Sequence, residues 1–166
     1  ASSINAALTR GRIIRHHLTL DLEAEDHAVR GSFHADLPAI QRPVRVKGLN
    51  PNWAAGAWSK NMDLFAPISS DPEGWAWWMW RPDLDHGELF IGNVVTCDQP
   101  EVMLRLLQRL DGGYELLAHN PTGRPLTVNM VGAEGGPVAG FTAQGRLAPG
   151  AEQRWHIGGA PYARLP

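Results

Sequence analysis

The chain has 166 residues, 43% of them hydrophobic, and a formal net charge of −2 at pH 7. This length suits one domain with its own hydrophobic core, and we predict a single β-sandwich domain over residues 1–166. Basic and acidic residues are nearly balanced and form no block of like charge, which argues against nucleic acid as a partner. No apolar run reaches the roughly 18 residues of a membrane span, so no membrane partner is expected either.

Alternation of apolar and polar residues predicts strands in the first third of the chain. Three leucines alternate with polar residues in 12–22, which we interpret as one strand with His16 and His17 inside it. Adjacent strand residues point to opposite faces, so these two histidines are not expected to chelate one metal ion. Residues 28–35 alternate as well and would complete a hairpin, and 44–49 form a third strand.

The segment 50–74 shows little periodicity and is rich in residues that favour turns. Irregular segments of this length in a compact domain are usually functional or packed loops. We therefore place the foremost candidates for ligand contact here, at Trp53, Trp58 and Asn61.

The run 75–80 contains four tryptophans in six residues, which makes this part of the chain tryptophan-rich. Alternation places Trp78 and Trp80 on one face of a strand and Trp75 and Trp77 on the other. Both faces are then apolar, which favours a central strand packed on two sides. We expect Trp78 and Trp80 to be mainly core, and Trp75 and Trp77 to contact ligand at the edge.

A further strand is predicted over 87–97, with a bulge or bend at Gly92-Asn93. Two patterns fit the following residues 99–110. An early proline, a capping acid and apolar residues on one face fit a short helix. Alternation and the turn signal at 111–113 instead fit one arm of a hairpin, and we favour this strand.

The last third of the chain has three alternating segments separated by glycine and proline turns, which is typical of an antiparallel meander: 125–131, 138–145 and 152–158. With the preceding segments they predict an all-β fold of about ten strands, either an antiparallel β-sandwich or a jelly roll.

Tryptophans displayed beside polar side chains on such a scaffold are typical of carbohydrate binding, because the flat C–H faces of sugars stack on aromatic rings. The alternative for any one tryptophan is burial in the core, since large aromatic residues are heavily buried on average. Asp83 and Glu88 can in addition hold sugar hydroxyls or act as an acid and a base. The predicted ligand-binding residues are Trp53, Trp58, Asn61, Trp75, Trp77, Arg81, Asp83 and Glu88.

Motifs that would establish catalysis or a cofactor are missing from the sequence. There is no nucleophile elbow, dinucleotide fingerprint or phosphate loop, and the histidines have no chelating spacing. The acidic segment 83–88 lacks the third acid and the later glutamate of a calcium loop. Cys97 is the single cysteine, which excludes an intrachain disulfide. We predict no catalytic residue, no metal and no cofactor, and we disfavour an enzyme.

Two turns near the end of the chain carry a family resemblance. The sequence Ala118-His119-Asn120-Pro121-Thr122, followed downstream by Ala148-Pro149-Gly150, resembles the accessory β-sandwich domains attached to bacterial polysaccharide-degrading enzymes. Combined with clustered tryptophans, the chain is similar to carbohydrate-binding modules. The resemblance covers about the last third and supports architecture more than activity. No binding residue of a known family is carried over by position.

The resemblance implies a non-catalytic carbohydrate-binding module of a larger secreted enzyme, with a polysaccharide or oligosaccharide as ligand and an adjoining catalytic domain as partner. Two alternatives remain open on the residues alone. One is a structural or interaction domain without ligand, in which every tryptophan is core. The other is a small β-sandwich lyase or hydrolase that uses His86 with Glu88 or another acid.

Overall fold

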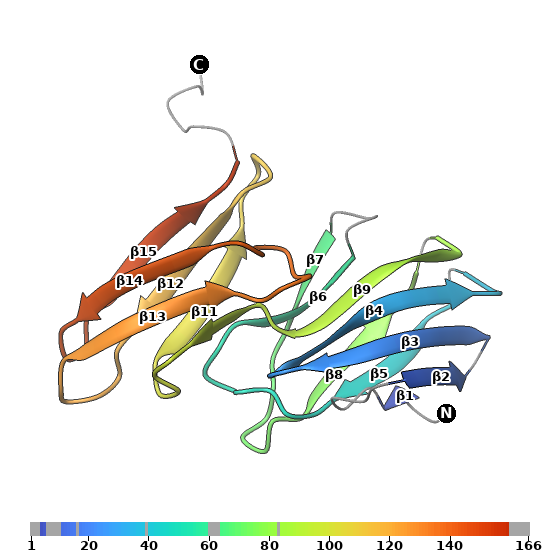
Figure 1. The fold of residues 1–166 in the computed structure, drawn as a ribbon, viewed down its shortest axis with the longest axis horizontal. Helices are drawn as coiled ribbons and strands as arrows, with labels where there is room; N and C mark the ends of the chain where they lie inside the picture. Colours follow the sequence, from blue (N-terminus) through green and yellow to red (C-terminus); the bar gives the residue numbers. More distant parts are fainter. Residues whose placement is uncertain are drawn as a thin grey trace.

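The computed structural model describes residues 4–5, 11–15, 17–38, 40–59, 64–82 and 84–159. In these residues the regular structure consists of fifteen β-strands, without a helix. The part of the chain that is described therefore holds no helix with the length and hydropathy of a membrane span. The all-β prediction is confirmed, and the strands form several antiparallel sheets in a β-sandwich arrangement (Figure 1).

The first half of the chain folds into two sheets that pack face to face. The smaller sheet has the strand order β1 (Ile4–Asn5), β5 (Arg42–Val46), β8 (Ala76–Trp80), and β1 runs parallel to β5. The larger sheet has six antiparallel strands in the order β2 (Gly11–Arg15), β3 (Leu18–Glu25), β4 (Ala28–Ala35), β9 (His86–Asn93), β6 (Ala55–Ser59), β7 (Leu64–Ile68).

The core between these sheets is formed by inward-facing residues of both sheets. Leu20 and Phe33 from the larger sheet meet Val44 and Trp80 from the smaller one, and all four are at most 3% exposed. In β5 and β8 the inward residues are buried or half-buried and the outward residues are more exposed, because only one face of these strands meets the other sheet.

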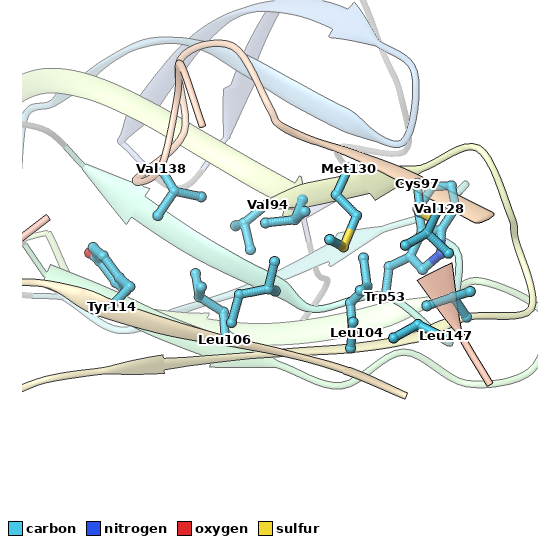
Figure 2. Close-up of a cluster of buried hydrophobic side chains, with 14 of the residues drawn as sticks. Trp53, Val94, Cys97, Leu104, Leu106, Tyr114, Val128, Met130, Val138 and Leu147 are labelled. Carbon is cyan, nitrogen blue, oxygen red and sulfur yellow. The ribbon is translucent and has the colours of Figure 1, made fainter. Parts of the chain in front are cut away.

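The second half forms another pair of three-stranded antiparallel sheets. One has the order β10 (Val95–Cys97), β13 (Leu126–Gly132), β14 (Thr142–Leu147), and the other β11 (Met103–Gln108), β12 (Tyr114–His119), β15 (Glu152–Ile157). Figure 2 shows the core between them, where Leu104, Leu106, Val128 and Met130 interdigitate. Trp53 enters this second core from the first half of the chain.

The chain passes from the first half to the second at the end of β9 (His86–Asn93). The bend predicted at Gly92-Asn93 lies at this point. Gly92 has φ 153°, and a Cβ atom there would lie 2.5 Å from Cα of Ala28. Asn93 is fully buried, accepts the amide hydrogen of Asn50, and donates to the carbonyl oxygens of Asn50 and Trp53 at 3.1 Å. These bonds lie within the first half and hold the segment that carries Trp53 against the end of β9. The single domain stays a prediction tested below.

The two turns of the family resemblance lie together, joined by Asn120. Its buried amide nitrogen donates to the carbonyl oxygens of Arg124 at 2.7 Å and Leu147 at 3.1 Å, and its side-chain oxygen accepts from the amide and hydroxyl of Thr122. Backbone bonds between Asn120 and the residues 150–151 complete the contact. One buried side chain therefore satisfies the polar groups of both turns.

The single strand predicted over 12–22 is wrong, since this segment is the hairpin β2–β3, with Arg15 paired to Leu18. His17 lies in the turn at φ 59°, and His16 lies outside the described residues. A two-residue turn leaves apolar residues at every second position on both sides of it. His16-His17 is not among the sequences that favour such a turn, so the pattern alone does not reveal it.

The structure also corrects the prediction for residues 50–74 and decides between the two patterns considered for residues 99–110. The irregular stretch 50–74 contains the hairpin β6–β7, which was missed because β6 consists mostly of small residues with weak strand preference. The short helix considered near 99–110 is wrong, and the favoured strand is β11. Its pairing with β12 buries Val102, Leu104 and Leu106 in the second core.

Candidate functional site

The structure contradicts Trp53 as an exposed ligand contact. Trp53 is 7% exposed, and the ring of His27 packs edge-on against it with centroids 5.1 Å apart. Trp58, on β6 opposite Phe90, is half-buried and packs against the second core. Both tryptophans lie where the two halves meet, so burial of apolar surface between the halves explains their positions.

The other predicted polar residues do not assemble around one tryptophan. Asn61 and Asp83 lie outside the described residues. Glu88 is exposed on β9 opposite Ser32, on the outer face of the six-stranded sheet. The tryptophans of β8 belong to the other sheet, so Glu88 and the exposed Trp77 lie on opposite outer faces of the sandwich. Arg81 is exposed directly after β8.

The tryptophan run forms β8, the end strand of the three-stranded sheet. Trp80 is 1% exposed, contacts Phe33 edge-on at 4.9 Å and stacks on Trp78 at 5.3 Å, while Trp78 is half-buried against the core. The inward placement of these two tryptophans is confirmed. The expected packing on both sides is wrong, since Trp77 is 60% and Met79 is 55% exposed.

The outer side of β5 and β8 and the residues flanking them is here called the aromatic face. The pairing of the strands sets Arg45 directly opposite Trp77 and Pro43 opposite Met79. The aromatic face comprises six residues: Pro43, Arg45, Lys47, Trp75, Trp77 and Met79. These side chains come from two segments far apart in the sequence, and only the β5–β8 pairing unites them.

Two cations cover the indole rings of the aromatic face. The guanidinium carbon of Arg45 lies 3.9 Å from the ring centroid of Trp75 and 4.8 Å from that of Trp77. The ammonium nitrogen of Lys47 lies 5.3 Å from the Trp75 ring. At these distances the ring quadrupoles attract the cations, so the aromatic face combines aromatic surface with positive charge.

The positive charge of the aromatic face is not neutralised within the described residues, where neither Arg45 nor Lys47 forms an ion pair with a carboxylate. The turn before Trp75 contains Asp71, whose Oδ1 accepts the amide hydrogens of Glu73 and Trp75 at 2.9 and 3.0 Å. This acid therefore orders the backbone that carries Trp75.

A second arginine supports the same strands from the inside. Arg42, opposite Trp80, is 1% exposed and donates to the carbonyl oxygens of Leu37 at 2.8 Å and Ile40 at 3.0 Å. Burial lowers the pKa of its guanidinium. Arg42 thus anchors the chain that enters β5, while Arg45 faces outward.

Other chemically active side chains remain dispersed. Within the described ranges no group of three or more histidine, cysteine, aspartate or glutamate side chains is placed to hold a metal ion. His34 and His86 pair across β4 and β9 at exposed positions, and His86 lowers the pKa of Asp85 by hydrogen bonding to it at 2.6 Å. Burial raises the pKa of the Cys97 thiol, which disfavours the reactive thiolate.

The sequence interpretation included Trp75 and Trp77 but missed Arg45 and Lys47. Their alternation with Val44 and Val46 was visible and indicated an outward direction, yet nothing local showed that they would meet tryptophans. No protein-family model, curated protein or solved structure matches the chain. The functional proposal therefore rests on the residues and their geometry.

Proposed function

We propose that this protein binds carbohydrate on the aromatic face, with a sugar ring stacked on Trp77. The observation that carries the proposal is the 60% exposure of Trp77. The neighbouring tryptophans are less exposed, since Trp80 is buried and Trp75 and Trp78 are half-buried. An exposed indole on a sheet offers a flat apolar surface to the C–H face of a pyranose ring. Polar groups at its edges can then accept or donate hydrogen bonds to the hydroxyls.

Preorganisation of the aromatic face favours binding. The stack of Trp75, Arg45 and Trp77 limits the rotamers of all three side chains before any ligand arrives. Each rotamer-rich side chain immobilised on binding costs about 0.5–1.5 kcal/mol, so prior ordering retains that free energy for affinity. The backbone beneath is held by strand pairing from Arg42 to Val46, which keeps the rings at a fixed separation.

The wider biological setting is part of the proposal. As the family resemblance implies, we propose an accessory module that holds an adjoining catalytic domain of a secreted enzyme close to its polysaccharide. The module itself performs no bond cleavage. Its contribution is a raised local concentration of substrate, which depends on linkage between the two domains.

Affinity electrophoresis through gels that contain soluble polysaccharides tests carbohydrate binding. Retardation of the protein by at least one polysaccharide, lost in Trp77→Ala, is the expected result. Leu107→Ala is the matched control, because Leu107 is 49% exposed on a strand of the other half. Circular dichroism establishes that each variant is folded. Unchanged retardation of a folded Trp77→Ala variant would refute stacking on this indole.

A protein-binding function is the second candidate, favoured by Met79. This side chain is 55% exposed beside Trp77, and contiguous exposed apolar groups are typical of protein interfaces. Saccharide titration separates the two functions. A change in tryptophan fluorescence with a polysaccharide that also retards the protein supports sugar binding, whereas unchanged emission across a broad panel favours a protein partner.

A further inference from the structure

We infer that the carbohydrate bound on the aromatic face is anionic, a polysaccharide that carries carboxylate or sulfate groups. This inference rests on the proposed function and adds the class of ligand. It follows from the cations that share the face with the exposed indole. A neutral sugar needs the indole and hydrogen-bonding groups only, whereas an acidic sugar also needs a positive partner.

Two cations lie over the indole rings of the face, and a third directly follows its strand β8 in sequence. Lys47 lies beside Trp75 at one end, Arg45 lies between Trp75 and Trp77, and exposed Arg81 follows β8 at the other end. From Trp75 to Arg81 an extended strand covers about 20 Å, at about 3.3 Å per residue. This length accommodates several sugar units in a row, with charges spaced along the chain.

The surroundings of the cations leave their charge available to a ligand. In the described part of the chain no carboxylate pairs with Arg45 or Lys47, although most other arginine partners found there are acids. Asp71 and Glu73 are the described acids closest in sequence to Trp75, and the Asp71 carboxylate is engaged by backbone amides. Local charge on the face is therefore positive although the whole chain has a net charge of −2.

Stacking and ion pairing would act on different atoms of one acidic sugar. The C–H face of the ring contacts Trp77, while its carboxylate or sulfate oxygens accept hydrogen bonds from the guanidinium or ammonium groups nearby. Single-stranded nucleic acid has the same combination of flat rings and anions. We favour the polysaccharide because the basic residues of the chain form no continuous block that could follow a phosphate backbone.

Affinity electrophoresis and calorimetry with the full chain test the inference, using polygalacturonate, a sulfated galactan, a neutral glucan and a single-stranded oligonucleotide as probes. Tighter binding to an acidic polysaccharide than to the glucan is expected. Because exposed ion pairs are screened by salt, affinity should fall about tenfold between 50 and 500 mM NaCl. Lys47→Gln and Arg81→Gln should each weaken binding about threefold, since exposed pairs contribute modestly.

Matched variants separate the inference from the function on which it rests. Arg105→Gln removes an exposed cation from β11 in the other half and should leave affinity unchanged. Neutral glucan binding that needs Trp77 but tolerates Lys47→Glu and Arg81→Glu would overturn the anionic ligand and preserve carbohydrate binding. Failure of every polysaccharide to bind the folded protein would overturn both. Tighter binding of the oligonucleotide than of any polysaccharide would overturn the assignment to carbohydrate.

Discussion

Arg45 lies over the indole of Trp75, with its guanidinium carbon 3.9 Å from the ring centroid. The contact joins β5 to the residue that precedes β8, and it also reaches Trp77 at 4.8 Å. An arginine at this place orders the aromatic face without burying it, because the guanidinium contacts both rings and leaves Trp77 60% exposed. Rigidity and exposure are therefore combined in one surface.

The tryptophans of β8 should differ strongly in their contributions to stability. Trp80→Ala removes a fully buried indole that contacts Phe33 and Trp78, and is expected to lower the free energy of unfolding by about 3–5 kcal/mol. Trp77→Ala should lower it by less than about 1 kcal/mol, because that indole is already in water. Urea unfolding followed by circular dichroism measures both. Equal losses for the two variants would contradict the inward and outward assignment of β8.

The junction of the two C-terminal turns should depend on Asn120. Asn120→Ala leaves the carbonyl oxygens of Arg124 and Leu147 without their buried donor, and we expect a loss of about 3 kcal/mol. Thr122→Val removes only the hydroxyl bonds to Asn120 and Arg124, and should cost about 1 kcal/mol. Thermal or urea unfolding provides the comparison. A smaller loss for Asn120→Ala than for Thr122→Val would show that the junction does not depend on the amide.

The two halves should unfold as one unit. The insertion of Trp53, held in place by Asn93, into the second core connects them, so a single transition that coincides by fluorescence and circular dichroism is expected. Asn93→Ala should lower the free energy of unfolding by about 3 kcal/mol, because the amide of Asn50 and the carbonyl oxygen of Trp53 lose this partner and the carbonyl oxygen of Asn50 loses one of its two donors. Asn52→Ala, which loses one exposed bond to Pro100 in the second half, should cost much less than Asn93→Ala. Two separate transitions in the unchanged protein would contradict a single domain.

Asp98 should make stability depend on pH in the acid range. Its carboxylate accepts the amide and side-chain nitrogens of Asn129 at 2.8 and 2.7 Å, and the side-chain bond is the main cause of its lowered pKa. A lowered pKa in the folded state means that the stabilisation is complete above the unfolded value of about 3.9 and is lost as the pH falls through the folded value.

The corresponding test compares Asp98→Asn with the unchanged protein in urea at several pH values. A loss of about 0.5–1 kcal/mol is expected at pH 7, kept small by solvent exposure, and it should shrink below about pH 4. Asp26→Asn removes the same charge from an exposed turn and serves as the control. A difference that grows as the pH falls would contradict the stabilising role of the ionised carboxylate.

Local patterns identified most strands because alternation reflects the geometry of a single extended chain. The strand 28–35 was predicted with its observed bounds, and parity within β8 placed Trp78 and Trp80 on the same face. Alternation did not reveal the turn between β2 and β3, because the two histidines that connect Arg15 to Leu18 are not residues that favour a tight turn. Small residues concealed β6 in a similar way, because they carry little alternation of hydrophobicity.

The sequence alone therefore determined the all-β class, the common face of Trp78 and Trp80, and the opposite directions of Arg45 and Val44, since each depends on local backbone geometry. Only the tertiary structure decided which strands became neighbours. It covered Trp53 and Trp58 where the halves meet, and it paired β5 with β8 so that Arg45 reached Trp75 and Trp77. Strand pairing is a choice among distant segments, made by the fit of whole sheets around a shared core.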